Sequence, residues 1–356
     1  MGGWEHRADG MKQRCQLGIN LHISCRVFDK GPQVPVGAYA KVLPLAHSGP
    51  RPREGEENRY DRPMGKASRR KKVAVSADQP AYRPPIPFVE RPFEGLPNEV
   101  ELVAMREIIP CATLSGRTTE EHGGADFDIV TLLPDGHPAM IRPDGRILVG
   151  LQTRSNSGDL SHDVAAALLA ALQAQSDGVD GVIDIDVREP APRLQDIVDP
   201  KAFGDMEIVA DFGYWFDPNQ ELTPEMRDAL EQNRADVVPT AAVPGTEGMY
   251  WCEMNRNFVR YVSDAPEHKL FDALARLQAA GKARLGEGSR FVGAFRACGL
   301  AIPVFELAEG ASAEDVAADA KALAENVVKA LKETTPLTAD ERRARQGLVS
   351  RQVTIR

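Results

Sequence analysis

The sequence has no long apolar run and few cysteines, and each absence excludes a class of protein. No stretch approaches the roughly 18 consecutive apolar residues that a membrane helix needs. The N-terminus lacks the basic, apolar and small-residue order of a secretion signal. We therefore expect a cytoplasmic protein without membrane contact. No Cys-x-x-Cys pair occurs, so neither a disulfide framework nor a cysteine zinc site is indicated; the cysteines are Cys15, Cys25, Cys111, Cys252 and Cys298.

The common cofactor and catalytic motifs are also missing. The chain has no P-loop, no Gly-x-Gly-x-x-Gly turn, no Gly-x-Ser-x-Gly nucleophile elbow and no His-x-x-x-His pair. We expect no cofactor and no metal ion, and the sequence leaves open whether the protein is an enzyme. Asp184 and Asp186 alternate along a predicted strand and would share a face, but no third metal ligand is obvious. A solvated acidic strand face is the simpler interpretation.

Acidic residues outnumber basic ones, with 52 Asp and Glu against 43 Lys and Arg, so the 356-residue chain has a net charge of -9. Its 42% hydrophobic and 27% charged residues are typical of a globular protein of about two domains. An acidic surface repels polyanions. Any contact with nucleic acid must therefore be local.

A basic segment interrupts the N-terminal part of the chain. Residues 1–63 lack a sustained apolar period and end in a polar run, which predicts a disordered leader. "MGKASRRKK" follows at 64–72 and is typical of the opening of a protein. We interpret Met64 as the natural start and 1–63 as an annotation extension or a dispensable leader. The alternative is a genuine disordered N-terminus.

Residues 64–91 are predicted to form a basic and proline-rich tail. Six prolines lie between Pro80 and Pro97, which favours an extended linker. The Pro-Pro-Ile-Pro motif either docks in a groove of a partner or lies along its own domain.

The remaining chain predicts an α+β fold in two related halves, 92–199 and 200–334, followed by a charged C-terminal tail at 335–356. In the first half, a helix after Asn98 precedes "DFDIVTLL" and the hairpin "AMIRPDGRILVGLQT", and "SHDVAAALLAALQA" has helical periodicity. The second half has the hairpin "GMYWCEMNRNFVRYVS" and further helix patterns. We expect a mainly antiparallel sheet with helices on one face. The ββα units either recur by duplication or share only alanine-rich composition.

The loop "TRSNSGD" at 153–159 is the best ligand-site candidate. It runs from a strand into a helix N-terminus, where backbone N–H groups and the helix dipole favour anions. Helix capping by Ser157 or Asp159 explains the same residues equally well. The predicted ligand-binding residues are Thr153, Arg154, Ser155, Ser157 and Gly158.

The stretch "MNRNFVRY" matches the later part of an RNA-recognition strand signature. Phe258, Val259 and Tyr261 fit, but the leading basic residue, the glycine and the first stacking aromatic are missing. We favour aromatic core residues with Arg256 and Arg260 at the edge.

The amino-acid sequence of the body resembles a known family. "PFEGLPNEVELVAMREIIPCAT", "VTLLPDGHPAMIRPDGRILVGLQTRSNSGDLSHDVAAALLAAL" and "CGLAIPVFELAEG" are similar to an uncharacterised family of high-G+C bacteria, a domain of unknown function. The similarity covers roughly residues 92 to 334. Members often begin with a basic segment similar to "MGKASRRKK", which supports Met64 as the start. Some relatives carry a SEC-C-type zinc knuckle that is absent here, so zinc is not implied, and the family brings no established catalytic residues.

These observations favour a binding protein over an enzyme. We expect the basic segment to touch RNA or the ribosome, and the acidic body to engage a protein partner. The alternative is an enzyme or small-molecule binder that uses the 153–159 loop. The predicted nucleic-acid-binding residues are Lys66, Arg69, Arg70, Lys71 and Lys72.

Overall fold

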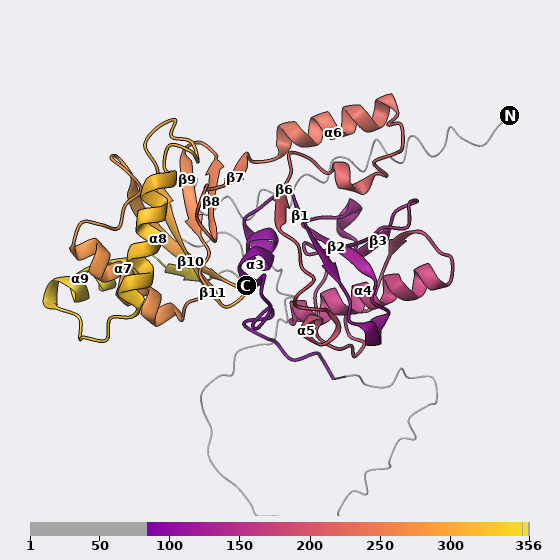
Figure 1. Cartoon of the computed structure of the whole chain (residues 1–356), viewed down its shortest axis with the longest axis horizontal. Coiled ribbons are helices and arrows are strands. Elements are labelled where there is room, and N and C mark those ends of the chain that lie inside the picture. The colour runs from indigo at the N-terminus through magenta and orange to yellow at the C-terminus, as the bar shows by residue number, and fades with distance from the viewer. Residues whose placement is uncertain (1–83, 351, 355–356) are drawn as a thin grey trace, which may run out of the picture. The chain divides into compact units, whose positions relative to one another are not determined.

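The computed structural model describes residues 84–350 and 352–354 (Figure 1). These residues belong to one compact unit. The predicted leader at 1–63, residues 64–83 of the predicted tail and the five basic residues from Lys66 to Lys72 lie outside the described residues.

Two six-stranded sheets form the framework. The first has the strand order β5-β3-β4-β2-β1-β6 and the second has the order β12-β10-β11-β9-β8-β7. All strand pairs are antiparallel except β2 with β4 and β10 with β12. The first sheet comprises β1 (Ala112–Arg117), β2 (Asp126–Val130), β3 (Ala139–Ile141), β4 (Ile147–Gly150), β5 (Gly181–Ile183) and β6 (Met206–Ile208). The second comprises β7 (Thr240–Ala242), β8 (Met249–Glu253), β9 (Asn257–Tyr261), β10 (Arg290–Ala297), β11 (Leu300–Glu306) and β12 (Gln352–Thr354).

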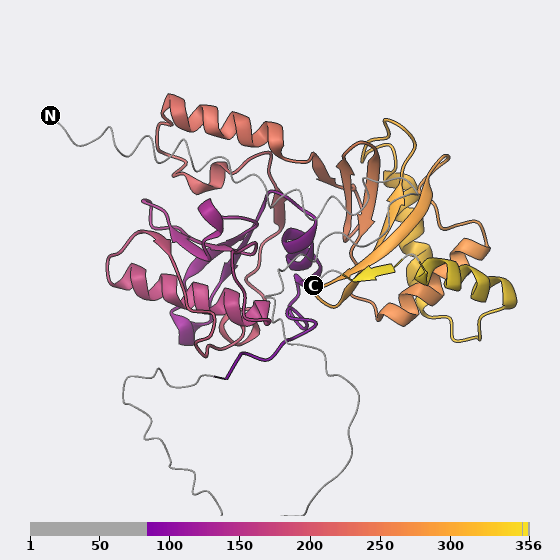
Figure 2. The same ribbon diagram turned by 180° about the vertical axis from the view of Figure 1, so that it is seen from behind.

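Seven α-helices accompany these sheets in the described part of the chain. They are α3 (Glu99–Glu107), α4 (Leu160–Ser176), α5 (Leu194–Ile197), α6 (Pro224–Asp236), α7 (Glu267–Ala279), α8 (Ala317–Leu331) and α9 (Ala339–Val349). Helix α6 has no buried residue and leads into β7, as the salmon coil of Figure 2 shows. None of the described helices is long and apolar enough to cross a bilayer.

Helix α3 lies between the two sheets and belongs to a core that both of them share (Figure 1). Leu102, Val103 and Met105 of α3 are fully buried. The same cluster contains Phe127 of the first sheet and Ile302 of the second, together with apolar residues of α4 and α5. The two predicted halves therefore fold around one hydrophobic core.

Each sheet also has a second packed face. The second sheet buries Val259 and Phe305 against α7 and α8 in a separate cluster. On the first sheet, Leu148 packs with Tyr214 and Trp215. The side-chain alternation of the strands explains these faces, because successive residues of a strand point to opposite sides of the sheet.

The predicted fold class is confirmed: the chain is α+β with two mostly antiparallel sheets. The hairpins β3–β4 and β8–β9 form where turn signals and period-2 patterns predicted them. A repeated ββα unit is not shown. Helix α4 follows the second hairpin of the first sheet, whereas α7 lies between the two hairpins of the second sheet.

The boundaries differ from those expected at two places. Strand β6 and the segment 212–216 lie beyond residue 199, yet β6 pairs with β1 and the segment packs on the first sheet. Residues 335–356, expected as a charged tail, contain α9 and β12. Leu348 is the one buried residue of α9, which explains why its sequence carries little apolar signal.

Arg91, in the segment before α3, connects this helix to the second half of the chain. Its guanidinium donates to both carboxylate oxygens of Glu99, at 2.5 and 2.7 Å, and to the carbonyl of Asp264 at 3.2 Å. Glu99 is only 6% exposed. Arg91 also packs on Gly299, where a Cβ would lie 2.7 Å from the Arg91 Cβ. Glycine is therefore required at this turn, which also has φ +77°.

We predict that Arg91→Met lowers the free energy of unfolding by about 2 to 3 kcal/mol, because it leaves the buried Glu99 carboxylate without a partner. Urea denaturation measures the loss. Arg91→Met/Glu99→Met should recover most of it, since no buried charge remains. Arg117→Met, at an exposed pair with Asp126, should leave the free energy of unfolding close to that of the parent, because solvent screens this pair. Equal losses for the Arg91 and Arg117 single variants would contradict the assignment.

Candidate functional site

The predicted ligand loop connects β4 to α4, and its residues divide into two groups. Arg154 and Ser155 are exposed, whereas Thr153, Ser157 and Gly158 are half-buried. The Thr153 hydroxyl donates to the Ser155 carbonyl at 2.9 Å. Arg154 forms a loose ion pair with Asp135, with 3.6 Å between nitrogen and oxygen. Only Ser157 and Gly158 of the five predicted residues join the polar network of the helix terminus.

Asp159 is the N-cap of α4, one of the two residues predicted for this role. Its carboxylate accepts hydrogen bonds from the backbone N–H groups of Ser161, at 3.1 Å, and His162, at 3.4 Å. Its second oxygen lies 3.0 Å from Nε of Arg193. Asp159 is only 4% exposed. A buried carboxylate of the chain itself thus occupies the position that an anionic ligand would take at this terminus.

A second carboxylate, Asp163, binds the preceding loop to the first turn of α4. Asp163 accepts the backbone N–H of Ser157 at 2.8 Å and lies 2.9 Å from Nδ1 of His162. The other ring nitrogen of His162 lies 2.9 Å from the carbonyl of Glu189. Because a carbonyl only accepts, Nε2 must carry a proton.

This geometry does not form a serine–histidine–aspartate triad. In a triad, the serine and the carboxylate bind opposite nitrogens of the imidazole, so that a proton passes through the ring. Here Ser157 Oγ, at 3.5 Å, and Asp163 Oδ1 both face Nδ1 of His162. The arrangement instead fixes the start of the helix.

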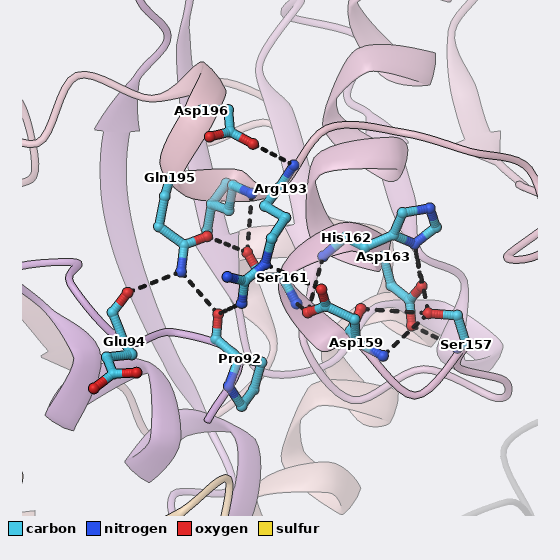
Figure 3. A network of polar contacts seen from close by, with 11 residues as sticks. Pro92, Glu94, Ser157, Asp159, Ser161, His162, Asp163, Arg193, Gln195 and Asp196 are labelled. Atoms are coloured by element: carbon cyan, nitrogen blue, oxygen red, sulfur yellow. Dashed lines mark hydrogen bonds and ion pairs between the residues drawn. The ribbon is translucent and has the colours of Figure 1, made fainter. Parts of the chain in front are cut away.

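A third set of contacts fastens the N-terminal segment of the body to the same helix (Figure 3). The hydroxyl of Ser161 donates to Gln195 Oε1 at 2.5 Å and accepts the backbone N–H of Leu194 at 2.9 Å. The amide nitrogen of Gln195 donates to the carbonyls of Pro92, at 2.8 Å, and Glu94, at 3.1 Å. Arg193 reaches the Pro92 carbonyl as well, at 2.6 Å. The network therefore joins segments that lie about 100 residues apart in the chain.

The end of the proline-rich segment lies along its own domain. The backbone N–H of Val89 donates to the carbonyl of Gly158 at 3.0 Å. Gly158 has φ +107°, and a Cβ there would lie 3.5 Å from Cα of Phe88. The loop predicted to bind a ligand is thus partly covered by the chain itself. Phe88 nevertheless keeps 71% of its surface exposed.

The space left at the loop is small. A cavity of about 10 Å³, lined in part by Thr153, Ser155 and Asp163, is close to the volume that a single water requires. A wider, open depression of about 740 Å³ lies elsewhere, at α7 and α9, with Leu337 and Val349 in its wall. Nowhere in residues 84–350 do three or more His, Cys, Asp or Glu side chains gather as metal ligands.

The other predicted positions have separate structural roles. Phe258 is buried in the shared core and Tyr261 in the core beneath α7 and α8, so the two rings lie on opposite faces of β9. They cannot form one stacking surface for bases, and the expected core role is confirmed. Asp184 pairs with His137 at 2.7 Å, and Asp186 pairs with Arg188 at 2.8 Å.

Several residues of the network were not predicted from the sequence, among them Asp163, Arg193 and Gln195. Asp163 had a usable signal, because acidic residues are favoured in the first turn of a helix. Arg193 and Gln195 had none, because their partners at Asp159, Ser161 and Pro92 are distant in the chain.

Comparison with known proteins matches residues 92–356 to a family model described as "Family of unknown function (DUF5926)". The chain belongs to this family. The match includes the C-terminal helix α9, which the resemblance seen in the sequence did not reach. No curated protein and no solved structure matches the chain. The DUF5926 region thus contains both sheets and the whole α4 network.

We predict that Asp159→Ala destabilises the DUF5926 region by about 2 kcal/mol. The substitution removes the cap, worth about 1 kcal/mol, and leaves the partly exposed Arg193 without its carboxylate. Ser157→Ala should cost only about 0.5 kcal/mol, because Ser157 caps no helical N–H group. Thermal and urea unfolding monitored by circular dichroism provide the comparison. A Ser157 variant as unstable as the Asp159 variant would refute the assignment of the cap.

Proposed function

We propose that this protein is a cytoplasmic binding protein that contacts RNA, free or within the ribosome, through the basic residues Lys66 and Arg69 to Lys72. The acidic DUF5926 region serves as the folded body and engages a protein partner. The segregation of charge along the chain carries this proposal.

Charge is distributed unequally along the chain. Five of the seven residues from Lys66 to Lys72 are cationic and none is acidic. Without these five charges the rest of the chain has a net charge of -14, against -9 for the whole. A short cationic segment next to an acidic body can neutralise several phosphates, whereas the body repels them.

Ion pairs in the body support the same assignment. Many arginines on the surface of the described residues already contact carboxylates, which reduces the positive potential available to a polyanion. Such pairs include Arg117–Asp126, Arg142–Asp144, Arg188–Asp186, Arg234–Asp211, Arg296–Glu267 and Arg345–Asp272.

The 153–159 loop is a weaker candidate for a binding site than the basic segment. Asp159 accepts helix N–H groups, Asp163 accepts the loop N–H of Ser157, and Phe88 and Val89 cover Gly158. A ligand role for Thr153 to Gly158 therefore stays a prediction, and the proposed function does not depend on it.

We predict that RNA binding by the full chain falls steeply with salt. The log–log slope should be about -3 if four phosphates are contacted, at roughly -0.7 per phosphate of a single strand. Substituting Arg69, Arg70, Lys71 and Lys72 together by Gln should abolish binding without changing the melting temperature. Fluorescence anisotropy with labelled RNA and ribosome co-sedimentation measure the effect.

A matched control removes the same charge from the body. Arg117, Arg188, Arg234 and Arg343 each have a side chain at least 43% exposed and paired with a carboxylate. Substituting these four by Gln should leave RNA binding intact. If both fourfold variants lose RNA binding equally, the effect is one of net charge alone. If the basic-segment variant binds RNA as tightly as the parent, the proposal is rejected.

A further inference from the structure

Arg260 is a buried cation in the middle of the second sheet. It lies on β9, directly opposite Tyr250 of β8 and Val304 of β11, and is only 5% exposed. Its neighbour Val259 points into the core beneath α7 and α8. Arg260 is therefore on the opposite face, which carries Phe258 and Val304 and contributes to the core shared with α3.

Among the described residues, none forms a hydrogen bond or ion pair with the guanidinium of Arg260. Its Nε and Nη2 atoms are buried and make no hydrogen bond. A buried charge without a partner costs several kcal/mol, and an unsatisfied buried polar group commonly marks a bound water or ion. Other buried charged residues in the described part of the chain are paired: Glu99 with Arg91, Asp159 with Arg193, Asp163 with His162, and Glu306 with Arg256 and Arg290.

The neighbouring carboxylate, Glu306, forms no hydrogen bond or ion pair with Arg260 and is bound by two other arginines. Glu306 lies opposite Phe258, two pairs along the strands from Arg260 and on the same face. One of its oxygens binds Arg256 and the other binds Arg290. Burial raises the pKa of Glu306, but the hydrogen bonds from the two arginines outweigh burial, so the net shift is downward. Arg256, Arg260 and Arg290 therefore share this side of the sheet with Glu306, and their three positive charges exceed its single negative charge by two.

The other side of Arg260 adds a neutral donor. Burial is the main cause that raises the pKa of the Tyr250 hydroxyl, with Glu101 of α3 adding to it. The hydroxyl therefore keeps its proton and can donate. Burial also raises the pKa of Glu101, which disfavours a competing negative charge there.

We propose that Arg260 is the inner ligand of a binding site for a phosphate-type oxyanion, with Arg256 and Arg290 as its outer cations and Tyr250 as a neutral donor. A dianion matches the two excess charges, and the planar guanidinium fork suits paired oxygen atoms. The side chains of Arg256 and Arg290 are 64% and 67% exposed, so an anion can approach this end of the sheet from solvent. The site lies in the body and is independent of the basic residues at 66–72.

Thermal unfolding in inorganic phosphate and in sodium chloride of equal ionic strength tests the site. Phosphate should raise the melting temperature of the full chain by a few degrees at about ten times its dissociation constant. Arg260→Met should abolish this shift. In chloride alone, the same variant should melt at or above the temperature of the parent, because an unpaired buried charge is gone. Arg188→Gln, at an exposed pair in the first half, is the matched control and should keep the full shift.

A second measurement keeps the test decisive if Arg260→Met does not fold. Arg260→Lys retains the charge but not the fork, and should weaken phosphate binding at least tenfold in titrations followed by ³¹P NMR. Glycerol 3-phosphate in place of inorganic phosphate distinguishes a phosphate monoester from the free ion as the better ligand. The proposal is overturned if the parent shows no phosphate-specific shift, if Arg260→Met keeps the shift, or if Arg260→Lys binds as tightly as the parent.

Discussion

The packing of α3 between two sheets is the contact on which the rest of the structure depends. Leu102, Val103 and Met105 contribute to one continuous core with strands of both halves, so neither sheet has an independent interior on that side. The Arg91–Glu99 pair adds a polar link at the same place, because Arg91 also contacts Asp264 beside the second sheet. The family match runs from residue 92 to 356 and so contains both sheets. This agrees with a folded unit that cannot be divided between its two sheets.

Charge neutralisation within the body determines which surfaces remain open to ligands. The positive end of α4 is occupied by Asp159 and Asp163, and Arg193 in turn is paired with Asp159. Asp159, at the end of the loop that suggested a ligand site, thus fixes the start of a helix, whereas Gln195 holds Pro92 and Glu94. Around Glu306 the cations outnumber the carboxylates. This excess of positive charge is local and buried at one side, so the overall composition of the chain does not reveal it.

The sequence predicted those elements whose apolar period is strong and local. Helices α4 and α7 and the hairpin β8–β9 follow from side-chain spacing and from turn residues. Strand β1 was missed because Gly116 adds no apolar side chain to its alternating pattern. Glycine is needed there, since a Cβ would lie 2.9 Å from the ring of Phe127. Helices α6 and α9 bury almost nothing of their own and have little pattern to read. Of the candidate site, the cap at Asp159 was predictable from local rules, whereas Arg193 and Gln195 depend on contacts that only the fold creates.

The shared core also determines when the chain can finish folding during synthesis. Helix α3 is complete roughly 190 residues before β11, whose apolar residues cover it. At about 5 to 20 residues per second, the ribosome needs about 10 to 40 s to make the intervening chain. During that time Leu102 and its neighbours lack the strands that will bury them, and contacts of such long sequence separation form slowly. The nascent first half therefore exposes part of the apolar surface of α3 until the last hairpin of the second sheet emerges.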